Sequence, residues 1–255
     1  MSRVRPELLI VGAAVLWGTT GTAQDLGDVG ASPVAVGTIR ILLGGLLLAV
    51  IASRSGRPTG PWGAYVVGAV AVAGHQASFF AAVDRAGVAL GTLVAIGSGP
   101  VFTGLVALLA SGERPVHRWY AATGLAVVGC GLLLAPGGDS ALDAGGLLLA
   151  LAAGFSYAVY TVAAKTVLDR DVSGPTVMAV FFLGGAVLLL PTLLVADTDG
   201  LTSLRGIGME LWLGVATTAV SYVLFSAGLR RLRASTVATL SLTEPLTAAL
   251  LGVLV

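Results

Sequence analysis

The chain has very few charged residues for its length. Of its 255 residues only 11% are Asp, Glu, Lys or Arg, while 56% are hydrophobic; a soluble domain carries about 25% charged residues. So few charges cannot cover a water-facing surface, so we expect lipid to surround most of the chain. The net charge of +1 argues against nucleic acid as a partner, because nucleic-acid binding relies on a strongly basic surface.

Cysteine, histidine and lysine are also scarce. The single cysteine, Cys130, lies in an apolar run, which excludes an internal disulfide and a cysteine-based metal site. His75 and His117 have no partners at the spacing of metal ligands, so we expect neither a metal nor a cofactor. A glycine-rich motif ending in Gly-Lys is absent too, which excludes ATP as a direct energy source within this chain.

Long apolar runs are what the sequence has in abundance. A helix that crosses a membrane needs about 20 mostly apolar residues. Backbone groups in lipid must be bonded within their own segment, so these runs are expected to be helices. The first run continues without a cleavage site, which favours a membrane span over a signal peptide. We predict an all-α, polytopic membrane helix bundle of about nine transmembrane helices, at 7–24, 33–52, 61–82, 88–110, 117–135, 145–165, 174–196, 208–229 and 234–255.

The basic residues predict an orientation. With the N-terminus in the cytoplasm, eleven of the 14 Lys and Arg residues fall in inner segments and two in outer segments, as the positive-inside rule expects. Arg40, the remaining one, lies inside the second span, and Glu210 counts among the acids of the outer segments. The preference for Arg over Lys is typical of a GC-rich bacterial genome. We therefore predict a multi-pass protein of the bacterial plasma (inner) membrane.

The two halves of the chain show an internal repeat at an offset of 145 residues. Residues 79–105 align with residues 224–250, and the paired prolines Pro100 and Pro245 give the alignment its weight. Each copy would have five spans, an odd number, so the copies must be inverted in the membrane, as in many secondary transporters. We predict repeats at 1–136 with five helices and at 144–255 with four, the tenth helix being absent.

Short motifs in both copies suggest a family. The chain resembles the drug/metabolite transporter superfamily, specifically proteins with two EamA-like domains. The first copy contributes Leu16-Trp17-Gly18, Pro33 with the run 38–42, and Pro100 followed by Gly112-Glu113; the second contributes Tyr157, Tyr160, Ala234-Ser235 and Thr243-Glu244-Pro245. The resemblance implies ten helices, both termini inside and transport of small metabolites. The second Gly-Glu and the tenth helix are departures from this pattern.

Glu244 is the first candidate for a functional residue. It lies about ten residues into the last span, or roughly 15 Å deep, and a carboxylate at such a depth marks a functional site by default. Burial favours its neutral form, so it could bind a proton, a cation or an amine. Pro245 removes a helix hydrogen bond, so we expect a helix break that frees the carbonyl of Ser241, with Pro100 as the equivalent break. The alternative is a protonated Glu244 that only bonds a neighbouring helix.

Three polar residues in other spans have two readings each. Arg40 is either a counter-charge for an anionic substrate or for Glu244, or a side chain that snorkels to the headgroups or bonds a carbonyl. His75 and Gln76 lie mid-span, where the histidine could shuttle protons or make a structural interhelical bond. We place all three in the substrate or ion pathway.

Polar residues also recur at helical spacing on several spans, on faces that turn away from lipid. Such faces line an aqueous path or join helices through hydrogen bonds. The pathway residues predicted on these faces are Trp17, Tyr157, Tyr160, Ser221, Tyr222 and Thr243.

Together these patterns predict a secondary transporter of small metabolites or drugs that works by alternating access, with proton-coupled export through Glu244. No catalytic residue is expected. The alternatives are a facilitator or channel, a truncated non-transporting subunit, and a membrane-embedded enzyme, although no His-Glu-x-x-His motif or paired intramembrane aspartates are present. The expected partners are a small-molecule substrate and the lipid bilayer, and a homodimer is left open.

Overall fold

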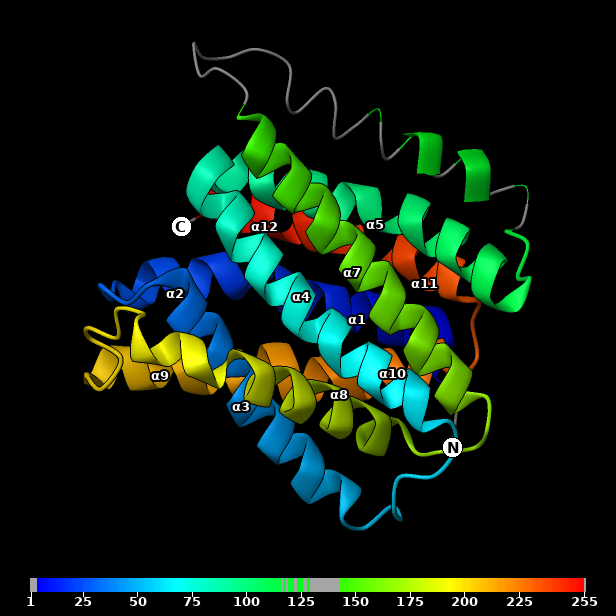
Figure 1. Ribbon diagram of the computed structural model, residues 1–255. Helices are drawn as coiled ribbons and strands as arrows, with labels where there is room; N and C mark the ends of the chain where they lie inside the picture. Colours follow the sequence, from blue (N-terminus) through cyan, green and yellow to red (C-terminus); the bar gives the residue numbers. More distant parts are fainter. Residues whose placement is uncertain are drawn as a thin grey trace.

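The computed structural model describes residues 4–254 except 116, 118, 122, 126–127 and 129–142, and every regular element among them is a helix. The all-α prediction is confirmed. The helices (Figure 1) are α1 Pro6–Gly18, α2 Thr20–Gly27, α3 Pro33–Ala52, α4 Trp62–Ala86, α5 Val88–Ser111, α7 Ala144–Leu168, α8 Gly174–Leu189, the 3-10 helix η1 Leu190–Leu194, α9 Leu204–Gly214, the π-helix η2 Val215–Val220, α10 Ser221–Leu229, α11 Ala234–Leu240 and α12 Thr243–Leu254.

Seven helical segments within the described residues are long and apolar enough to cross a membrane. They correspond to seven of the expected spans. The first expected span is present as α1 and α2, which are separated at Thr19 and are therefore individually short. The expected span at 117–135 lies largely outside the described residues.

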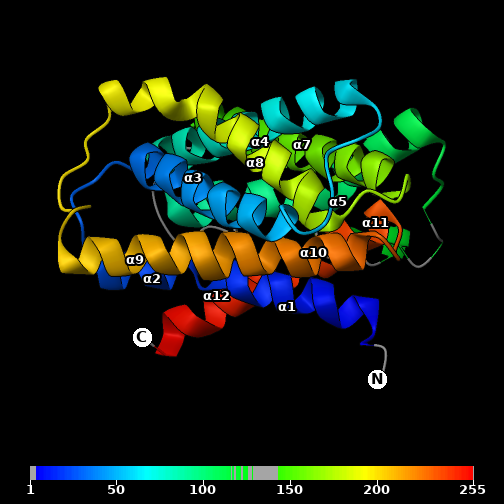
Figure 2. The same ribbon diagram turned by 90° about the horizontal axis from the view of Figure 1, so that it is seen from below.

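The helices form two three-part bundles on either side of a central pair. In the first bundle, α4 and α5 both pack on α7; in the second, α10 and α12 both pack on α1. The central pair, α3 and α8, pack against each other between the bundles (Figures 1 and 2). The same packing therefore occurs twice, as two related repeats require. The equivalent helices are α1 and α7, α3 and α8, α4 and α10, and α5 and α12.

The two repeats run in opposite directions across the molecule. In Figure 1, α1 starts at the end of the molecule where the N-terminus lies, whereas α7 starts at the opposite end. The central helices begin alike: Ser32 accepts from the backbone of Ala35, and Ser173 accepts from the backbone of Thr176, each just before a proline in the first turn. Serine caps with early prolines stabilise helix starts, so the two repeats use the same local signal.

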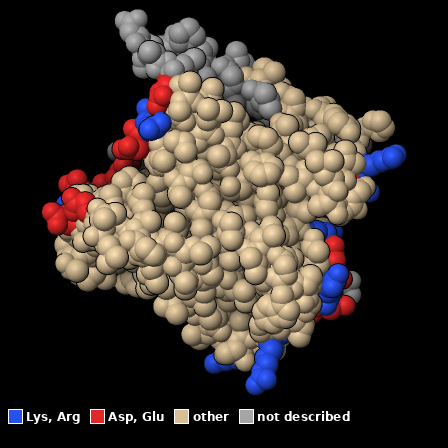
Figure 3. All heavy atoms as spheres, in the orientation of Figure 1, with Lys and Arg blue, Asp and Glu red and all other residues tan. Residues whose placement is uncertain are grey.

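The two ends of the molecule carry opposite charge (Figure 3). We call the end where α1, α4, α8 and α11 start the basic end, and the other the acidic end. The basic end carries Arg5, Arg54, Arg57, Arg114, Lys165, Arg170, Arg230, Arg231 and Arg233, and the acidic end carries Asp25, Asp28, Asp84, Asp143, Asp197 and Asp199. Between them the surface in Figure 3 is almost free of charge, which is the surface that a membrane covers.

Helix α5 continues through Pro100, so the predicted helix break at this residue is wrong. A proline deprives a helix of one hydrogen bond, but neighbouring hydroxyls and close packing can satisfy the surrounding backbone. The carbonyl that Pro100 leaves without its helix bond is that of Ile96. On either side of it, Ser98 donates to the carbonyl of Ala95 and Thr103 donates to the carbonyl of Gly99, which reinforces the neighbouring turns. The helix therefore tolerates the proline without ending.

Candidate functional site

Three helix interruptions occur in the second bundle, one in each of its members. The first separates α1 from α2 at Thr19, the second is the π-helix η2 between α9 and α10, and the third separates α11 from α12 at residues 241–242. A π-helical turn within a longer helix often marks a functional site. Interrupted helices near the middle of a membrane are where transporters bind substrates and ions.

Side-chain contacts bring these interruptions together. The indole of Trp17 donates to the hydroxyl of Ser221 at 2.9 Å, which joins α1 to the end of η2. The indole of Trp212 donates to the hydroxyl of Thr19 at 3.0 Å. A Cβ added to Gly18 would lie 2.8 Å from the carbonyl oxygen of Glu244, so α1 passes directly against the third interruption.

The third interruption lies just before Pro245 in the chain. Its geometry differs from the prediction in one respect, because the carbonyl of Ser241 is not free. It accepts from the backbone N–H of Glu244 at 2.9 Å, which replaces the bond that Pro245 cannot make. Thr243 also has a local role, since its hydroxyl donates to the carbonyl of Leu240. The predicted pathway residue Thr243 thus stabilises the interruption, and no hydrogen bond joins it to the other bundle in the described residues.

Arg40 turns toward the protein interior. Its Nη2 donates to the Oε1 of Gln76 at 3.0 Å, and the Nε2 of Gln76 donates to the backbone carbonyl of Gly37 at 3.2 Å. The amide of Gln76 is buried, so it fixes the guanidinium between α3 and α4. Snorkelling to the headgroups is therefore not what the structure shows, and the bond between Arg40 and Gln76 joins two of the residues predicted for the pathway.

His75 makes an interhelical bond. Its Nδ1 lies 2.9 Å from the backbone carbonyl of Ala153 on α7. The ring is flanked by Phe79, Tyr157 and Tyr160, with ring centroids 5.9, 6.4 and 6.0 Å away. Of the two readings of this residue, the structure displays the interhelical hydrogen bond.

Tyrosines connect the two bundles across the centre. The hydroxyls of Tyr160 on α7 and Tyr222 on α10 lie 3.0 Å apart. The hydroxyl of Tyr157 lies 3.0 Å from that of Ser241, beside the third interruption. The rings of Trp17 and Tyr222 are 5.1 Å apart, which extends the aromatic surface onto α1. These hydroxyls and rings form a largely buried surface that is aromatic but can donate and accept hydrogen bonds.

Two of the acidic residues on the helices of the second bundle are shielded from solvent. Glu244, which is partly buried at the start of α12, is one of them. Glu210 on α9 is the other. Its side chain is 4% exposed, and among the residues that the structure describes neither carboxylate oxygen has a hydrogen-bond partner. The expectation that Glu210 is an acid of the outer surface is therefore wrong, because the helix that carries it starts six residues earlier, at Leu204.

We define the central cluster as Trp17, Arg40, His75, Gln76, Tyr157, Tyr160, Ser221, Tyr222 and Glu244. Its side chains contact one another, and two cavities lie outside it. One of about 390 Å³ lies at the acidic end between α2, α9 and α12, and one of about 250 Å³ lies at the basic end between α5, α7 and α11. No member of the cluster lines either cavity.

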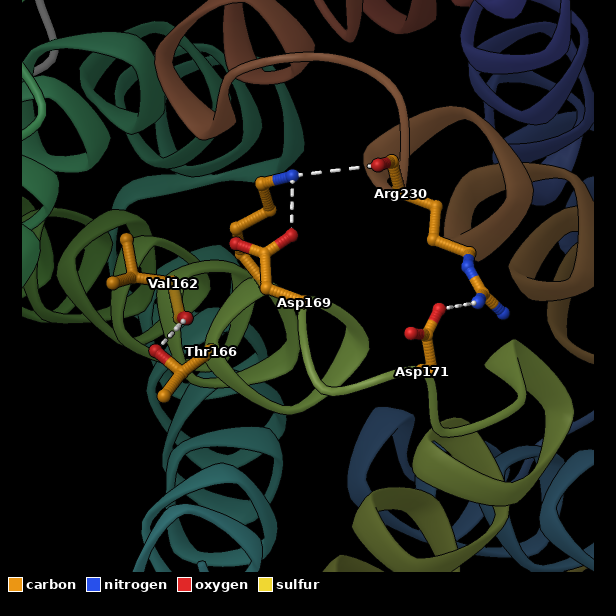
Figure 4. Close-up of polar contacts among 6 residues, drawn as sticks. Val162, Thr166, Asp169, Asp171 and Arg230 are labelled. Atoms are coloured by element: carbon orange, nitrogen blue, oxygen red, sulfur yellow. Dashed lines mark hydrogen bonds and ion pairs between the residues drawn. The ribbon is translucent and has the colours of Figure 1, made fainter. Parts of the chain in front are cut away.

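Polar contacts join the two bundles at the basic end. Arg230 forms an ion pair with Asp171 at 2.8 Å, and the Nζ of Lys165, paired with Asp169 at 2.8 Å, also reaches the backbone carbonyl of Arg230 at 3.5 Å (Figure 4). These contacts connect the loop after α7 with the loop after α10.

The loop after α5 is held in the same region. The Oε1 of Glu113 accepts from the hydroxyl of Ser235 at 3.0 Å and from its backbone N–H at 3.4 Å. Arg233 donates to the carbonyl of Arg114 at 3.1 Å. In this structure the two repeats are thus joined at the basic end, between the central cluster and the solvent on that side.

The architecture and this cluster define a class of protein: a multi-pass membrane transporter built from two related repeats. The model of the EamA-like transporter family matches residues 4–135 and again residues 144–255. The chain belongs to the EamA-like transporter family.

Similar proteins support this membership. An uncharacterized transporter of Bacillus subtilis, YwfM, is 41% identical over 250 residues, covering 97% of this chain and 84% of the relative. The threonine/homoserine exporter RhtA of Escherichia coli K12 is 29% identical over 257 residues, covering 97% of this chain and 81% of the relative. A solved crystal structure with 23% identity superposes with a TM-score of 0.83 over 98% of this chain and 87% of its own, which shows the shared fold.

Proposed function

We propose that the protein is a secondary transporter that exports small zwitterionic metabolites across a bacterial plasma membrane. The observation that carries the proposal is an aromatic surface with Arg40, held by Gln76, on one side and the helix interruption next to Glu244, where Tyr157 bonds Ser241, on the other. A cation and an acid on opposite sides of an aromatic surface suit a substrate that carries both a carboxylate and an ammonium group. The exporter RhtA is named for two such compounds, threonine and homoserine.

In this proposal the two charges have different roles. Arg40 binds the substrate carboxylate, because a guanidinium presents several donors in a fixed plane. Glu244 binds either the substrate ammonium group or a proton, and this exclusive choice couples export to proton entry. Trp17, Tyr157, Tyr160 and Tyr222 shape the site around the substrate.

The basic end and the acidic end serve as the two gates of an alternating-access cycle. The contacts of Glu113, Arg230 and Arg233 close the basic end in this structure, and they must separate to admit a substrate from that side. The proposed orientation places the basic end in the cytoplasm. Cysteines at Arg114 and Arg230 should then resist an impermeant thiol reagent in intact cells, whereas one at Asp199 should react; the reverse labelling would contradict the orientation.

The deciding experiment measures L-threonine flux in proteoliposomes against an imposed pH gradient. Glu244→Gln keeps the size of the side chain but cannot gain or lose a proton, so pH-driven flux should fall to the level of empty liposomes. Glu7→Gln serves as the matched control, since it alters an exposed glutamate at the start of α1, at the basic end, and should retain the pH dependence. If Glu244→Gln and wild type transport equally and respond equally to pH, Glu244 is not the coupling residue, and His75 is the next to examine.

A further inference from the structure

Glu210 is a buried acid that the proposed mechanism does not use. It lies on α9, 4% exposed, and neither of its oxygens has a hydrogen-bond partner among the described residues. An ionised carboxylate in such a place is costly unless a cation compensates it. The carboxyl group is therefore stable here either as the neutral acid or next to a positively charged side chain.

The helices packed on α9 offer few charged groups. These helices are α2, α3 and η2. Asp25 on α2 and Arg205 on α9 itself are exposed to the outside, and η2 carries no charged residue. Arg40 on α3 is the remaining charged group on these helices, and α3 packs directly on α9.

Arg40 and Glu210 lie at the same depth. Arg40 is seven residues from the start of α3 and Glu210 is six residues from the start of α9, and both helices start at the acidic end. At 1.5 Å per residue, the two Cα atoms are each about 10 Å from their helix starts. Because α3 and α9 pack against each other, a change of side-chain rotamer can bring the two charges together.

The guanidinium has a donor available for this contact. Its Nη2 is used by Gln76, but its Nε is buried and has no partner in the described part of the chain. In this conformation Arg40 thus bonds the neutral side chain of Gln76, and it makes no hydrogen bond to Glu210 on the neighbouring helix.

We propose that Glu210 is the resident counter-ion of Arg40 and competes with the carboxylate of the substrate for it. In the conformation described here Arg40 is held by Gln76. In the alternative rotamer it pairs with Glu210, and a substrate carboxylate that binds Arg40 must displace this pairing. This inference rests on the proposed function for the identity of the competitor, but the pairing of Arg40 with Glu210 stands without it. Glu210 thereby sets how tightly a carboxylate-bearing substrate is held, and so how readily it is released.

The pairing is tested by thermal unfolding of the purified protein in detergent. Arg40→Gln leaves a buried carboxylate without its cation, so it should lower the Tm. Adding Glu210→Gln removes that carboxylate, so the double variant should recover at least half of the lost Tm. Arg40→Gln with Glu244→Gln is the matched control and should recover less. Additive losses, or recovery confined to the Glu244 combination, would overturn the pairing.

The competition is tested by binding of two probes, L-threonine and L-threoninamide, which lacks the carboxylate. Glu210→Gln should tighten the binding of L-threonine at least about fivefold, the lower range of coupling between sites, and leave L-threoninamide unchanged. An unchanged or weaker affinity for L-threonine would refute the competition. If the wild-type protein binds neither probe, the substrate class of the proposed function is wrong, while the unfolding experiment still decides the pairing.

Discussion

The two three-helix bundles occupy equivalent places in the fold but differ in regularity. In the bundle of α4, α5 and α7 each helix is continuous for 24 or 25 residues, even through Pro100. In the bundle formed by α1 with α2, α9 with α10, and α11 with α12, every member is interrupted. The pseudo-symmetry of the repeats therefore governs packing but not backbone conformation.

Threonine hydroxyls account for part of this difference. At the interruptions, Thr19 and Thr243 donate to carbonyls three residues earlier, and Thr218 donates to one five residues earlier. In the regular bundle, Thr103 and Thr166 donate to carbonyls four residues earlier, in step with the helix. Side-chain bonds of this kind compete with the backbone ladder, so the irregular bundle exchanges helix bonds for side-chain bonds near the central cluster.

The closest approach in the irregular bundle gives the largest expected effect on stability. A Cβ at Gly18 would lie 2.6 Å from the Cβ of Thr247 and 2.8 Å from the carbonyl oxygen of Glu244, so α1 and α12 must separate. We expect Gly18→Ala to lower the free energy of unfolding by about 1–3 kcal/mol, the usual cost of overpacking. Thermal or denaturant unfolding in detergent measures it.

Gly21 provides the control on the same segment. A Cβ there meets nothing within 4 Å, so Gly21→Ala should leave stability unchanged or raise it by up to about 1 kcal/mol through helix propensity. Equal destabilisation by the two substitutions would show that the close contact between α1 and α12 does not hold the irregular bundle together.

The sequence determines most of the fold through one physical signal. Apolar runs of about 20 residues must be helices in lipid, so residues such as those of α3 and α8 identify their spans with almost no ambiguity. The interruptions could not be predicted in the same way. Thr217 and Thr218 are compatible with a continuous helix, and only their contacts with the rest of the bundle turn residues 215–220 into a π-helix.

Residues of the candidate site could be predicted from the sequence where a polar side chain lies within an otherwise apolar span. Arg40, Gln76 and Glu244 are recognisable for this reason, and the structure brings them into one region. Glu210 was missed because it lies near a span end, where an acid normally faces water. The signal that could have revealed it is its setting between Met209 and Leu211, both apolar, although burial on one helix face depends on neighbours that the sequence does not show.

Hydrogen exchange compares the two bundles directly. At the third interruption the backbone N–H groups of Leu242 and Glu244 bond carbonyls only three residues earlier. Such tight turns have poorer hydrogen-bond geometry and open more easily, so the amides at 242–244 should exchange at least about tenfold faster than those at 98–104 in α5. The first segment precedes Pro245 and the second contains Pro100, so a nearby proline cannot explain a difference in exchange rate between them. Exchange resolved by mass spectrometry in lipid nanodiscs measures the ratio, and equal protection would remove the distinction between the bundles.

The smallest expected effect lies outside both bundles, in the ion pair of Arg230 and Asp171 at the basic end. The side chain of Asp171 is 96% exposed and that of Arg230 is 38% exposed, so water and salt screen their attraction. Exposed ion pairs contribute about 0.2–1 kcal/mol, and Asp171→Asn should lower the free energy of unfolding by no more than this, with the loss disappearing at high salt.

A comparison with Glu113 makes this measurement informative about the gate. Glu113 is partly buried and binds both the hydroxyl and the backbone N–H of Ser235, so Glu113→Ala leaves an uncapped helix start and should cost more than Asp171→Asn. Both variants should also speed labelling of a cysteine placed at Thr166, which lines the cavity at the basic end, because each weakens the junction between the two bundles. If Asp171→Asn proves the more damaging of the two, the basic end is held by its surface charges rather than by the helix cap.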